Sequence, residues 1–404
     1  MISVEEAQLR IAAAFKPIDT ETADLGHLPG RVLAEDIRAH TDQPPFPISA
    51  MDGYAVRRAD LDAPRTVIGT APAGHPFKGR LEPGQAVRIF TGGVIPEGAD
   101  AIVIQEEVDR EGEIIHFNAS ALQGDYIRAA GLDFKSGDVL APKGKRVTGR
   151  DSALLAAGDI THAKVRRRPR IAIASIGDEL SRPGEPRRPG GIAASSGYGL
   201  SAMITAWGGA PCDFGILPDN AQEIATVADA DAELLVTLGG VSVGDHDLVQ
   251  KALGTRDFEL DFWKVAMRPG KPLIFGRLGP TPLLGMPGNP VSALVCAVLF
   301  LRPAIDALLG AEQSGCSLPQ RLKCGCRTMS ARLKRALPAN DARQSYLRAR
   351  LVYLEGELWA DPFEIQDSSM LSTLAQADSL VVRPPNAPAA EAGDHTEIIS
   401  LDGF

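Results

Sequence analysis

The stretch LLVTLGGVSVGDHD, residues 234–247, decides the fold of the central part of this chain. Its first five residues, Leu234–Leu238, form an apolar run that predicts a buried parallel strand. The loop Gly239–Gly244 then supplies three glycines and a serine, and acids follow at Asp245 and Asp247. Glycines let backbone N–H groups approach an anion closely, and carboxylates can hold the magnesium that accompanies a phosphate. A tight turn without a ligand is the alternative interpretation, because Gly-Gly pairs often follow strands.

Two further loops combine Gly and Pro with Lys, Arg, Asn or Ser: KVAMRPGKPLIF, residues 264–275, and LGMPGNPVS, residues 284–292. The segment SIGDEL, residues 175–180, follows another predicted strand and carries Asp178 and Glu179. Open α/β sheets bind ligands beyond the carboxyl ends of their strands. The sequence therefore predicts one polar site where these loops meet.

The composition is that of a soluble globular protein, with 404 residues, 44% hydrophobic and 23% charged. This length predicts roughly two to four domains. The formal net charge of -9 argues against a general nucleic-acid binder, which needs a basic face. The acidic start MISVEEAQLR is no signal peptide, and no apolar run approaches the roughly 18 residues of a membrane span. We therefore expect a cytoplasmic protein that binds neither nucleic acid nor membrane.

The five cysteines are expected to be reduced structural thiols, as is usual in the cytosol. A metal site around Cys324 and Cys326 is the alternative, but the paired C-x2-C spacing typical of zinc is missing. The cysteines are Cys212, Cys296, Cys316, Cys324 and Cys326.

The pattern along the chain predicts a multidomain α/β plus β protein. Residues 1–37 have helical periodicity, residues 38–138 contain short strands between Gly and Pro, and residues 139–165 return to a strand fragment and a helix. Strands and helices alternate over residues 166–313, which predicts a doubly wound α/β domain, and strands return over residues 314–404. The expected α/β strands are 170–174, 212–216, 234–238, 262–267 and 273–275; the expected helices are 150–157, 197–207, 221–230, 247–253 and 289–309; the expected tail strands are 321–326, 346–354 and 379–382.

Seven motifs in order give the chain a family resemblance. It resembles the MoeA family, the molybdopterin molybdenumtransferases of molybdenum-cofactor synthesis, to which the gephyrin enzymatic domain and plant Cnx proteins are related. The motifs are SAMDGYAV (49–56), TGGVIPEGAD (91–100), RAAGLD (128–133), GDEL (177–180), GGVSVGDHD (239–247), RPGKP (268–272) and MPGNPVSA (286–293).

The resemblance implies four regions and a reaction. The regions are an elongated linker domain (1–37 and 139–165), an inserted β domain (38–138), a doubly wound molybdopterin-binding α/β domain (166–313) and a C-terminal β-barrel-like domain (314–404). The family forms homodimers whose active site is shared between subunits. Its reaction is the insertion of molybdate into adenylylated molybdopterin, with release of AMP. Molybdopterin adenylyltransferase, which acts one step earlier, and cofactor-delivery proteins are the expected partners.

The resemblance also implies roles for particular residues. Asp52, Thr91 and Asp133 would reach the partner's site, while Glu179, Asp219 and Asp247 would line it from the α/β domain. Asp247 and Glu179 are the predicted ligands of Mg²⁺, which the pyrophosphate of the substrate requires. The predicted substrate-binding residues are Ser196, Gly239, Gly240, Ser242, Gly244, Lys264, Arg268, Lys271, Pro287, Asn289, Pro290 and Ser292.

Physical chemistry fits these roles. The amides of Gly239–Gly244 would cradle phosphate. Lys264, Arg268 and Lys271 would supply positive charge, although each could instead be a salt-bridge partner. Four positions depart from the family pattern, and they concern substrate affinity more than fold. They are Arg268 where Lys is frequent, Gly197 where an amide side chain is common, Asp367, an added carboxylate, and Ile48 where a polar or small residue is commoner.

Two other functions compete with the transferase. A molybdopterin-binding scaffold without turnover would keep the glycine loops and lose the acids, yet all of the predicted acids remain. An adenylyltransferase usually needs only a single short α/β domain, which would leave residues 1–165 without a role. The transferase is therefore the favoured interpretation.

Overall fold

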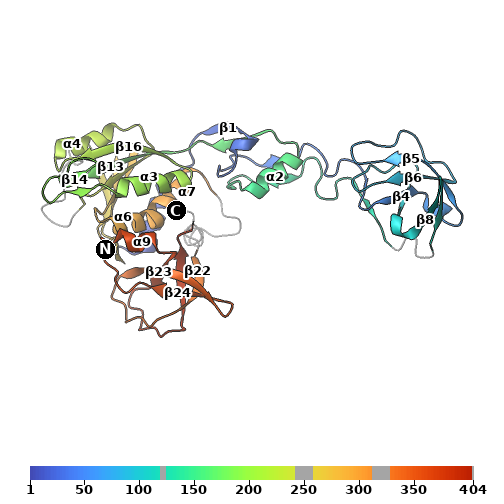
Figure 1. The fold of residues 1–404 in the computed structure, drawn as a ribbon. Coiled ribbons are helices and arrows are strands. Elements are labelled where there is room, and N and C mark those ends of the chain that lie inside the picture. Colours follow the sequence, from blue (N-terminus) through green and yellow to red (C-terminus); the bar gives the residue numbers. More distant parts are fainter. Residues whose placement is uncertain (119–123, 242–257, 312–327, 403–404) are drawn as a thin grey trace.

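The computed structural model describes residues 1–118, 124–241, 258–311 and 328–402. The molecule is elongated (Figure 1): an α/β domain and a small barrel lie at one end, a β domain lies at the other, and a narrow linker joins them. Both ends of the chain lie beside the α/β domain. The predicted fold class, multidomain α/β plus β, is confirmed.

The α/β domain is built on a six-stranded sheet with the order β16-β13-β17-β21-β20-β18. The first four strands are parallel, and β20 and β18 are antiparallel to their neighbours. From β13 the chain passes first to β16 on one side and then to β17 on the other, so the topological switch point lies between β13 and β17. The strands are β13 (Arg170–Ile176), β16 (Ala210–Leu217), β17 (Leu234–Leu238), β18 (Phe258–Trp263), β20 (Ile274–Leu278) and β21 (Thr281–Met286).

Helices cover both faces of this sheet. Ile171 and Ile173 of β13 face one core, shared with the helices α1, α3, α6 and α7, whereas Ala172 and Ala174 face the core of α4. This alternation follows from the two-residue repeat of a strand. The helical elements are α1 (Val4–Ala13), α3 (Ser196–Ala206), α4 (Ala221–Ala225), η4 (Thr226–Asp229), α6 (Pro290–Cys296), the π-helical η6 (Ala297–Leu301) and α7 (Arg302–Leu308).

The predicted helix over residues 289–309 is present, with Asn289 at the N-cap and Pro290 in the first turn. Its span Pro290–Leu308 is the one helix of the described residues that is long and apolar enough to cross a membrane. However, 78% of that window is buried inside the protein, as expected of a core helix.

One predicted strand ends early. The strand expected over 262–267 stops at Trp263, because Lys264 has a positive φ of 74° and turns the chain toward the barrel. The helix predicted over residues 247–253 lies outside the described residues.

The linker is a pair of two-stranded sheets with its own core. β1 pairs with β12 and β2 pairs with β11, so that the chain passes outward and returns beside itself. The helical periodicity assigned to residues 20–37 is wrong, since this stretch forms a strand and a short 3-10 turn interrupted by Pro29 and Gly30. The linker elements are β1 (Thr20–Asp24), η1 (Leu25–His27), β2 (Ile37–Arg38), β11 (Val139–Ala141), α2 (Gly149–Ala157) and β12 (His162–Arg166).

The β domain contains the sheet β7-β4-β6-β5-β9-β8 and the pair β3–β10. Two hydrophobic clusters inside it have no member from the other domains. Its elements are β3 (Ile48–Ser49), β4 (Gly53–Val56), η2 (Arg58–Asp60), β5 (Arg65–Ala71), β6 (Gln85–Ile89), β7 (Ala101–Ile104), η3 (Gln105–Glu107), β8 (Val108–Glu111), β9 (Ile114–Phe117) and β10 (Ile127–Arg128).

The C-terminal domain is a closed barrel, because the ladder β23-β24-β22-β26-β25 returns through a β23–β25 pairing. Strand β19, from the loop after β18, pairs with β23 and ties the barrel to the α/β domain. The tail strand expected over residues 321–326 lies outside the described residues. The elements are β19 (Met267–Arg268), β22 (Thr328–Leu333), β23 (Gln344–Leu354), β24 (Glu357–Pro362), α9 (Leu371–Ala375), β25 (Ser379–Arg383) and β26 (His395–Ser400); the short pair β14 (Leu180–Ser181) and β15 (Ile192–Ala193) belongs to the α/β domain.

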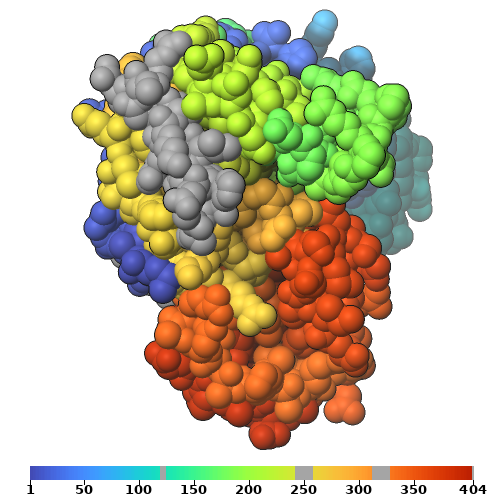
Figure 2. All heavy atoms as spheres, turned by 90° about the vertical axis from the view of Figure 1, so that its left-hand side faces the viewer, coloured from blue at the N-terminus to red at the C-terminus, as the bar shows by residue number. Residues whose placement is uncertain are grey.

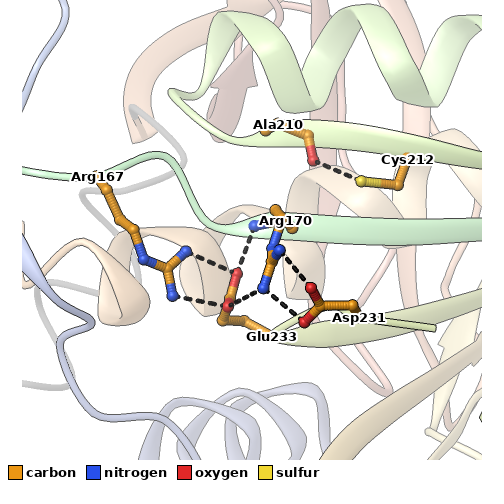
Figure 3. A network of polar contacts seen from close by, with 6 residues as sticks. All are labelled: Arg167, Arg170, Ala210, Cys212, Asp231 and Glu233. Atoms are coloured by element: carbon orange, nitrogen blue, oxygen red, sulfur yellow. Dashed lines mark hydrogen bonds and ion pairs between the residues drawn. The ribbon is translucent and has the colours of Figure 1, made fainter. Parts of the chain in front are cut away.

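An ion-pair network fixes the linker to the α/β sheet (Figure 3). The Arg167 guanidinium, just beyond β12, donates two hydrogen bonds to the Glu233 carboxylate at 3.1 and 2.7 Å. The Arg170 amide donates to the same carboxylate at 2.6 Å, and the Arg170 guanidinium holds Asp231. Burial alone would raise the pKa of Glu233, but the hydrogen bonds from Arg167 and the Arg170 amide outweigh it and lower the pKa. In the same view Cys212, a free thiol like Cys296, donates to the Ala210 carbonyl.

We predict that Glu233→Gln destabilises the α/β unit by about 1–3 kcal/mol at neutral pH, because two arginines lose their shared anion. The folded-state pKa of Glu233 is depressed, so its contribution is present above the ordinary value of 4.5 and is lost as the pH falls through the folded-state pKa. The difference between wild type and variant should therefore shrink as the pH is lowered below 4.5. Urea denaturation followed by tryptophan fluorescence measures it.

Asp231→Asn is the matched control. The Asp231 side chain is 83% exposed, so this change should cost no more than about 1 kcal/mol. Equal losses in the two variants would contradict the role assigned to Glu233.

Candidate functional site

A cavity lies at the switch point between β13 and β17. Ser175 and Ile176 line it from β13, Leu238 from β17, and Glu179 from the loop after β13. Ser195 and Ser196 at the start of α3, together with Gly288 and Pro290 before and within α6, complete the wall. The structure thus brings together three of the four sequence-predicted loops, 175–180, 234–247 and 284–292, at the carboxyl edge of the sheet, whereas the loop 264–275 does not line this cavity.

Gly239 makes this convergence possible. Its φ is 95°, and a Cβ atom there would lie 2.5 Å from the Ile176 carbonyl oxygen. Its amide donates to the Met286 carbonyl at 3.0 Å, which holds the glycine loop against the turn of Pro287 and Gly288. Gly240 also has a positive φ, of 71°. Glycine is required at 239 for steric as well as conformational reasons.

Acids flank the cavity. Asp178 and Asp219, each beyond the end of a strand, exchange hydrogen bonds between backbone amide and carboxylate at 3.4 and 3.3 Å. The described residues contain no group of three or more His, Cys, Asp or Glu that could hold a metal without help. Mg²⁺ needs only one or two carboxylates when substrate phosphates and water supply the other ligands. Glu179, with Asp178 and Asp219 nearby, has the carboxylates that a Mg²⁺ ion bound to substrate phosphates would need.

The predicted cations lie where the α/β domain meets the barrel. In the loop 264–275, the Lys264 amide donates to the Leu273 carbonyl and the Val265 amide donates to the Lys271 carbonyl. Lys271 therefore lies beside the start of the loop. Arg268 belongs to β19, next to β23. The Lys264 ammonium lies 3.8 Å from the centroid of the Trp263 ring. Among the described residues no acid forms an ion pair with Lys264, Arg268 or Lys271, although Arg268 is close enough to Asp341 for its charge to help lower the pKa of that carboxyl.

The barrel supplies residues that sequence reasoning missed. The Asn289 side-chain amide donates to the Ser368 hydroxyl at 3.1 Å, and the Val291 amide donates to the Ser368 carbonyl. Arg348 of β23 is 2% exposed and donates to the side-chain oxygen of Gln366 and to the Met370 carbonyl. Figure 2 shows this barrel directly below the α/β domain. The sequence signal for this contact was the loop 366–370, but only the fold pairs it with Asn289.

The remaining predicted α/β residues divide into three sets. Ser196 and Pro290 line the cavity, and Pro287 lies between β21 and α6. Ser292 is 5% exposed inside α6 and is therefore less available to a ligand than predicted. Three predicted residues lie outside the described part of the chain: Ser242, Gly244 and Asp247.

In the β domain, Asp52 and Thr91 form one unit. The amide and the hydroxyl of Thr91 both donate to the same carboxylate oxygen of Asp52 at 2.8 Å. These hydrogen bonds, and to a lesser extent the positive charge of Arg88, lower the pKa of the Asp52 carboxyl. Arg88 is held over the rings of Tyr54 and Phe90. The result is a partly exposed carboxylate of fixed orientation, which the hydrogen bonds favour in its ionised form.

The segment that contains Asp133 begins at β10, which pairs with β3, three residues before Asp52 in the chain. Asp133 itself is exposed, and its amide donates to the Gln43 carbonyl. Within one chain, however, the whole β domain lies at the far end of the linker from the switch-point cavity (Figure 1). The structure therefore groups the predicted acids into two separate sets, one at each end of the molecule.

A ligand cavity at the switch point of a parallel sheet, joined to a closed barrel and to a distant β domain, defines a multidomain α/β plus β protein that binds a ligand at the carboxyl edge of its sheet. Residues 2–158 match the family described as the MoeA N-terminal region (domains I and II), residues 172–307 a probable molybdopterin binding domain, and residues 330–401 the MoeA C-terminal region (domain IV). The chain belongs to the MoeA family, the molybdopterin molybdenumtransferases, as the sequence motifs predicted.

Relatives match along the full length. A molybdopterin molybdenumtransferase from Nostoc sp. is 34% identical, covering 95% of this chain and 89% of the relative. One from Haemophilus influenzae is 33% identical, covering 100% and 99%. A crystal structure of the molybdopterin biosynthesis moeA protein from Pyrococcus horikoshii has a TM-score of 0.84 at 27% identity, covering 99% of this chain and 100% of that one.

We predict that Thr91→Val raises the pKa of the Asp52 carboxyl toward its ordinary value, because one of its two hydrogen bonds is removed. The Thr91 amide still donates, so the recovery should be incomplete. An NMR titration of the Asp52 carboxyl measures the change. Thr70→Val, at an exposed threonine of β5, is the control and should leave this pKa unchanged. An unaltered Asp52 pKa in Thr91→Val would show that the hydroxyl does not tune the carboxylate.

Proposed function

We propose that this protein inserts molybdate into adenylylated molybdopterin and releases AMP. The observation that carries the proposal is the full-length family match together with the switch-point cavity, which is lined by Glu179 and by the turn at Gly288. Molybdate and the adenylylated pterin are substrates, so the protein has to bind two anions at once. Cations beside a phosphate-binding loop suit that requirement.

The arrangement suggests a division of labour. The glycine loop after β17 and the turn before α6 would receive the phosphates, where backbone amides and helix N-termini favour negative charge. Lys264, Arg268 and Lys271 would bind the oxyanions. Glu179, with Asp247, would hold Mg²⁺, which neutralises phosphate charge when bound. Asp178 and Asp219 support this assignment, since they add carboxylates at the same edge.

We further propose a cytoplasmic homodimer with a shared active site. Asp52, Thr91 and Asp133 are set on a domain that one chain carries away from its own cavity (Figure 1). A two-fold dimer would bring the β domain of one subunit to the cavity of the other, and would do so twice. A molybdopterin adenylyltransferase that supplies the substrate, and proteins that accept the product, are the expected transient partners.

A scaffold that binds molybdopterin without turnover is the competing function. The paired hydrogen bonds that orient Asp52 weigh against it, because a binding module has no need of a fixed carboxylate far from its ligand loops.

The direct test measures AMP release from adenylylated molybdopterin with molybdate present. The wild type should release AMP, and Glu179→Gln should reduce the rate about a hundredfold or more, the order expected for a lost electrostatic contact to reacting groups. Substrate binding without AMP release in the wild type would favour the scaffold.

Subunit mixing tests the shared site. Asp52→Ala and Glu179→Ala should each be inactive alone. Randomly mixed subunits should recover roughly a quarter of wild-type activity, because half of the dimers are mixed and each has one intact site of two. Co-refolding or co-expression provides the mixture, and two copies of the same variant provide the control. No recovery in mixtures that light scattering shows to be dimeric would contradict sharing between subunits.

A further inference from the structure

A second cavity adjoins the switch-point cavity on its β16 side. Its wall includes Arg182, Tyr198 and Ser201, Asp213 and Gly215 of β16, and Ser175, which also lines the first cavity. None of these residues belongs to the set predicted from sequence. The two cavities share the wall residues Ser175 and Ala194 and therefore lie side by side along the carboxyl half of the sheet.

The cavity is built on a β-bulge. The register between β13 and β16 shifts after Asp213, and the Gly215 amide donates to one carboxylate oxygen of Asp213 at 2.9 Å. Gly215 has a φ of 84°, and a Cβ there would lie 3.3 Å from the Arg182 guanidinium. The bulge thus turns a carboxylate toward the cavity and lets an arginine lie across the strand. Bulges commonly re-aim side chains in this way.

Several polar side-chain groups of this cavity have no hydrogen-bond or ion-pair partner among the described residues. Within the described part of the chain, neither the Arg182 guanidinium nor the second carboxylate oxygen of Asp213 has a hydrogen-bond or ion-pair partner. The Ser175 hydroxyl also has none there, although Ser175 is only 8% exposed. Gly197 faces this hydroxyl, and a Cβ at 197 would lie 3.3 Å from it. Arg182 and Asp213 are exposed, and all three groups line the cavity, so they are available to a ligand.

The chemistry of the wall restricts that ligand. Asp213 disfavours a simple anion and Arg182 disfavours a cation, whereas together they offer an acceptor beside a donor. The ring of Tyr198, 58% exposed, offers a stacking surface. A planar heterocycle that carries an amino group next to a ring nitrogen or carbonyl oxygen could bind all three side chains. Its amino group would donate to Asp213, the neighbouring nitrogen or oxygen would accept from Arg182, and its ring would stack on Tyr198. Both ends of adenylylated molybdopterin, the pterin and the adenine, have such an edge.

We propose that this cavity binds one heterocyclic end of the substrate, with Asp213 accepting from its amino group and Arg182 donating to the neighbouring acceptor. The proposal rests on the proposed function, because it takes the substrate from there. Ser175 would contact the substrate where it passes from one cavity to the other. The residues named here are specificity residues rather than participants in the chemistry.

Asp213→Asn gives the sharpest test. Asparagine keeps an oxygen for the Gly215 amide, so the bulge is preserved, but it replaces the free acceptor with a donor. We expect the KM for adenylylated molybdopterin to rise about tenfold or more with kcat little changed. Competition by AMP and by 6-hydroxymethylpterin identifies the end that is bound, because only the ligand that uses this cavity should inhibit the variant more weakly than it inhibits wild type.

Glu259→Gln is the matched control, an exposed acid on β18 at the opposite edge of the same sheet, and it should change nothing. Arg182→Ala provides an independent variant that leaves the bulge untouched and should weaken the same competitor. Unchanged KM and unchanged inhibition by both competitors in both variants would overturn the proposal, while wild-type turnover would leave the proposed function intact. If the wild type lacks turnover, the affinities of AMP and 6-hydroxymethylpterin for wild type and Asp213→Asn can be measured by calorimetric titration. Weaker binding of one of them to the variant would support the cavity, and equal binding of both would overturn it.

Discussion

The contact between the ends of β13 and β17 is the constraint on which the site depends. Gly239 passes so close to the Ile176 carbonyl that no side chain can be accommodated there. This approach sets the width of the switch-point cavity and the position of the turn at Gly288 against it. Every group that faces the cavity from α3 or α6 is placed relative to these two strand ends.

Electrostatics is organised locally, against the overall charge. The chain carries a net charge of -9, yet the loop that enters the barrel carries three cations without an ion-pair partner among the described residues. Asp341 lies near Arg268, and hydrogen bonds from Arg343, with a smaller contribution from Arg268, lower its pKa to about 2. A local cluster of cations on a chain of net negative charge attracts anions to that part of the surface and not to the surface as a whole.

Local signals explain what the sequence predicted well. β17 coincides with the predicted strand, because five buried residues end at a glycine pair that cannot continue it. Residues 20–37 were misjudged because their apolar spacing suits a helix, while pairing with β12 across the linker decides their structure. Arg348 could not be found from sequence, and Ser175 and Ser368 lie in segments that the sequence singled out, but their own contacts could not be predicted. Arg348 is a charged residue inside a barrel, and the other two matter only through neighbours distant in the chain.

The separation of hydrophobic cores has a thermodynamic consequence. The linker and the β domain each have clusters of their own, whereas α1, the α/β sheet and one face of the barrel share a single cluster. Cooperative units of this kind can melt independently, so one midpoint does not describe the molecule. All 3 tryptophans, Trp207, Trp263 and Trp359, lie in the α/β and barrel part. Their fluorescence therefore does not report the unfolding of the β domain. Calorimetry would detect that unfolding as a separate heat-absorption peak.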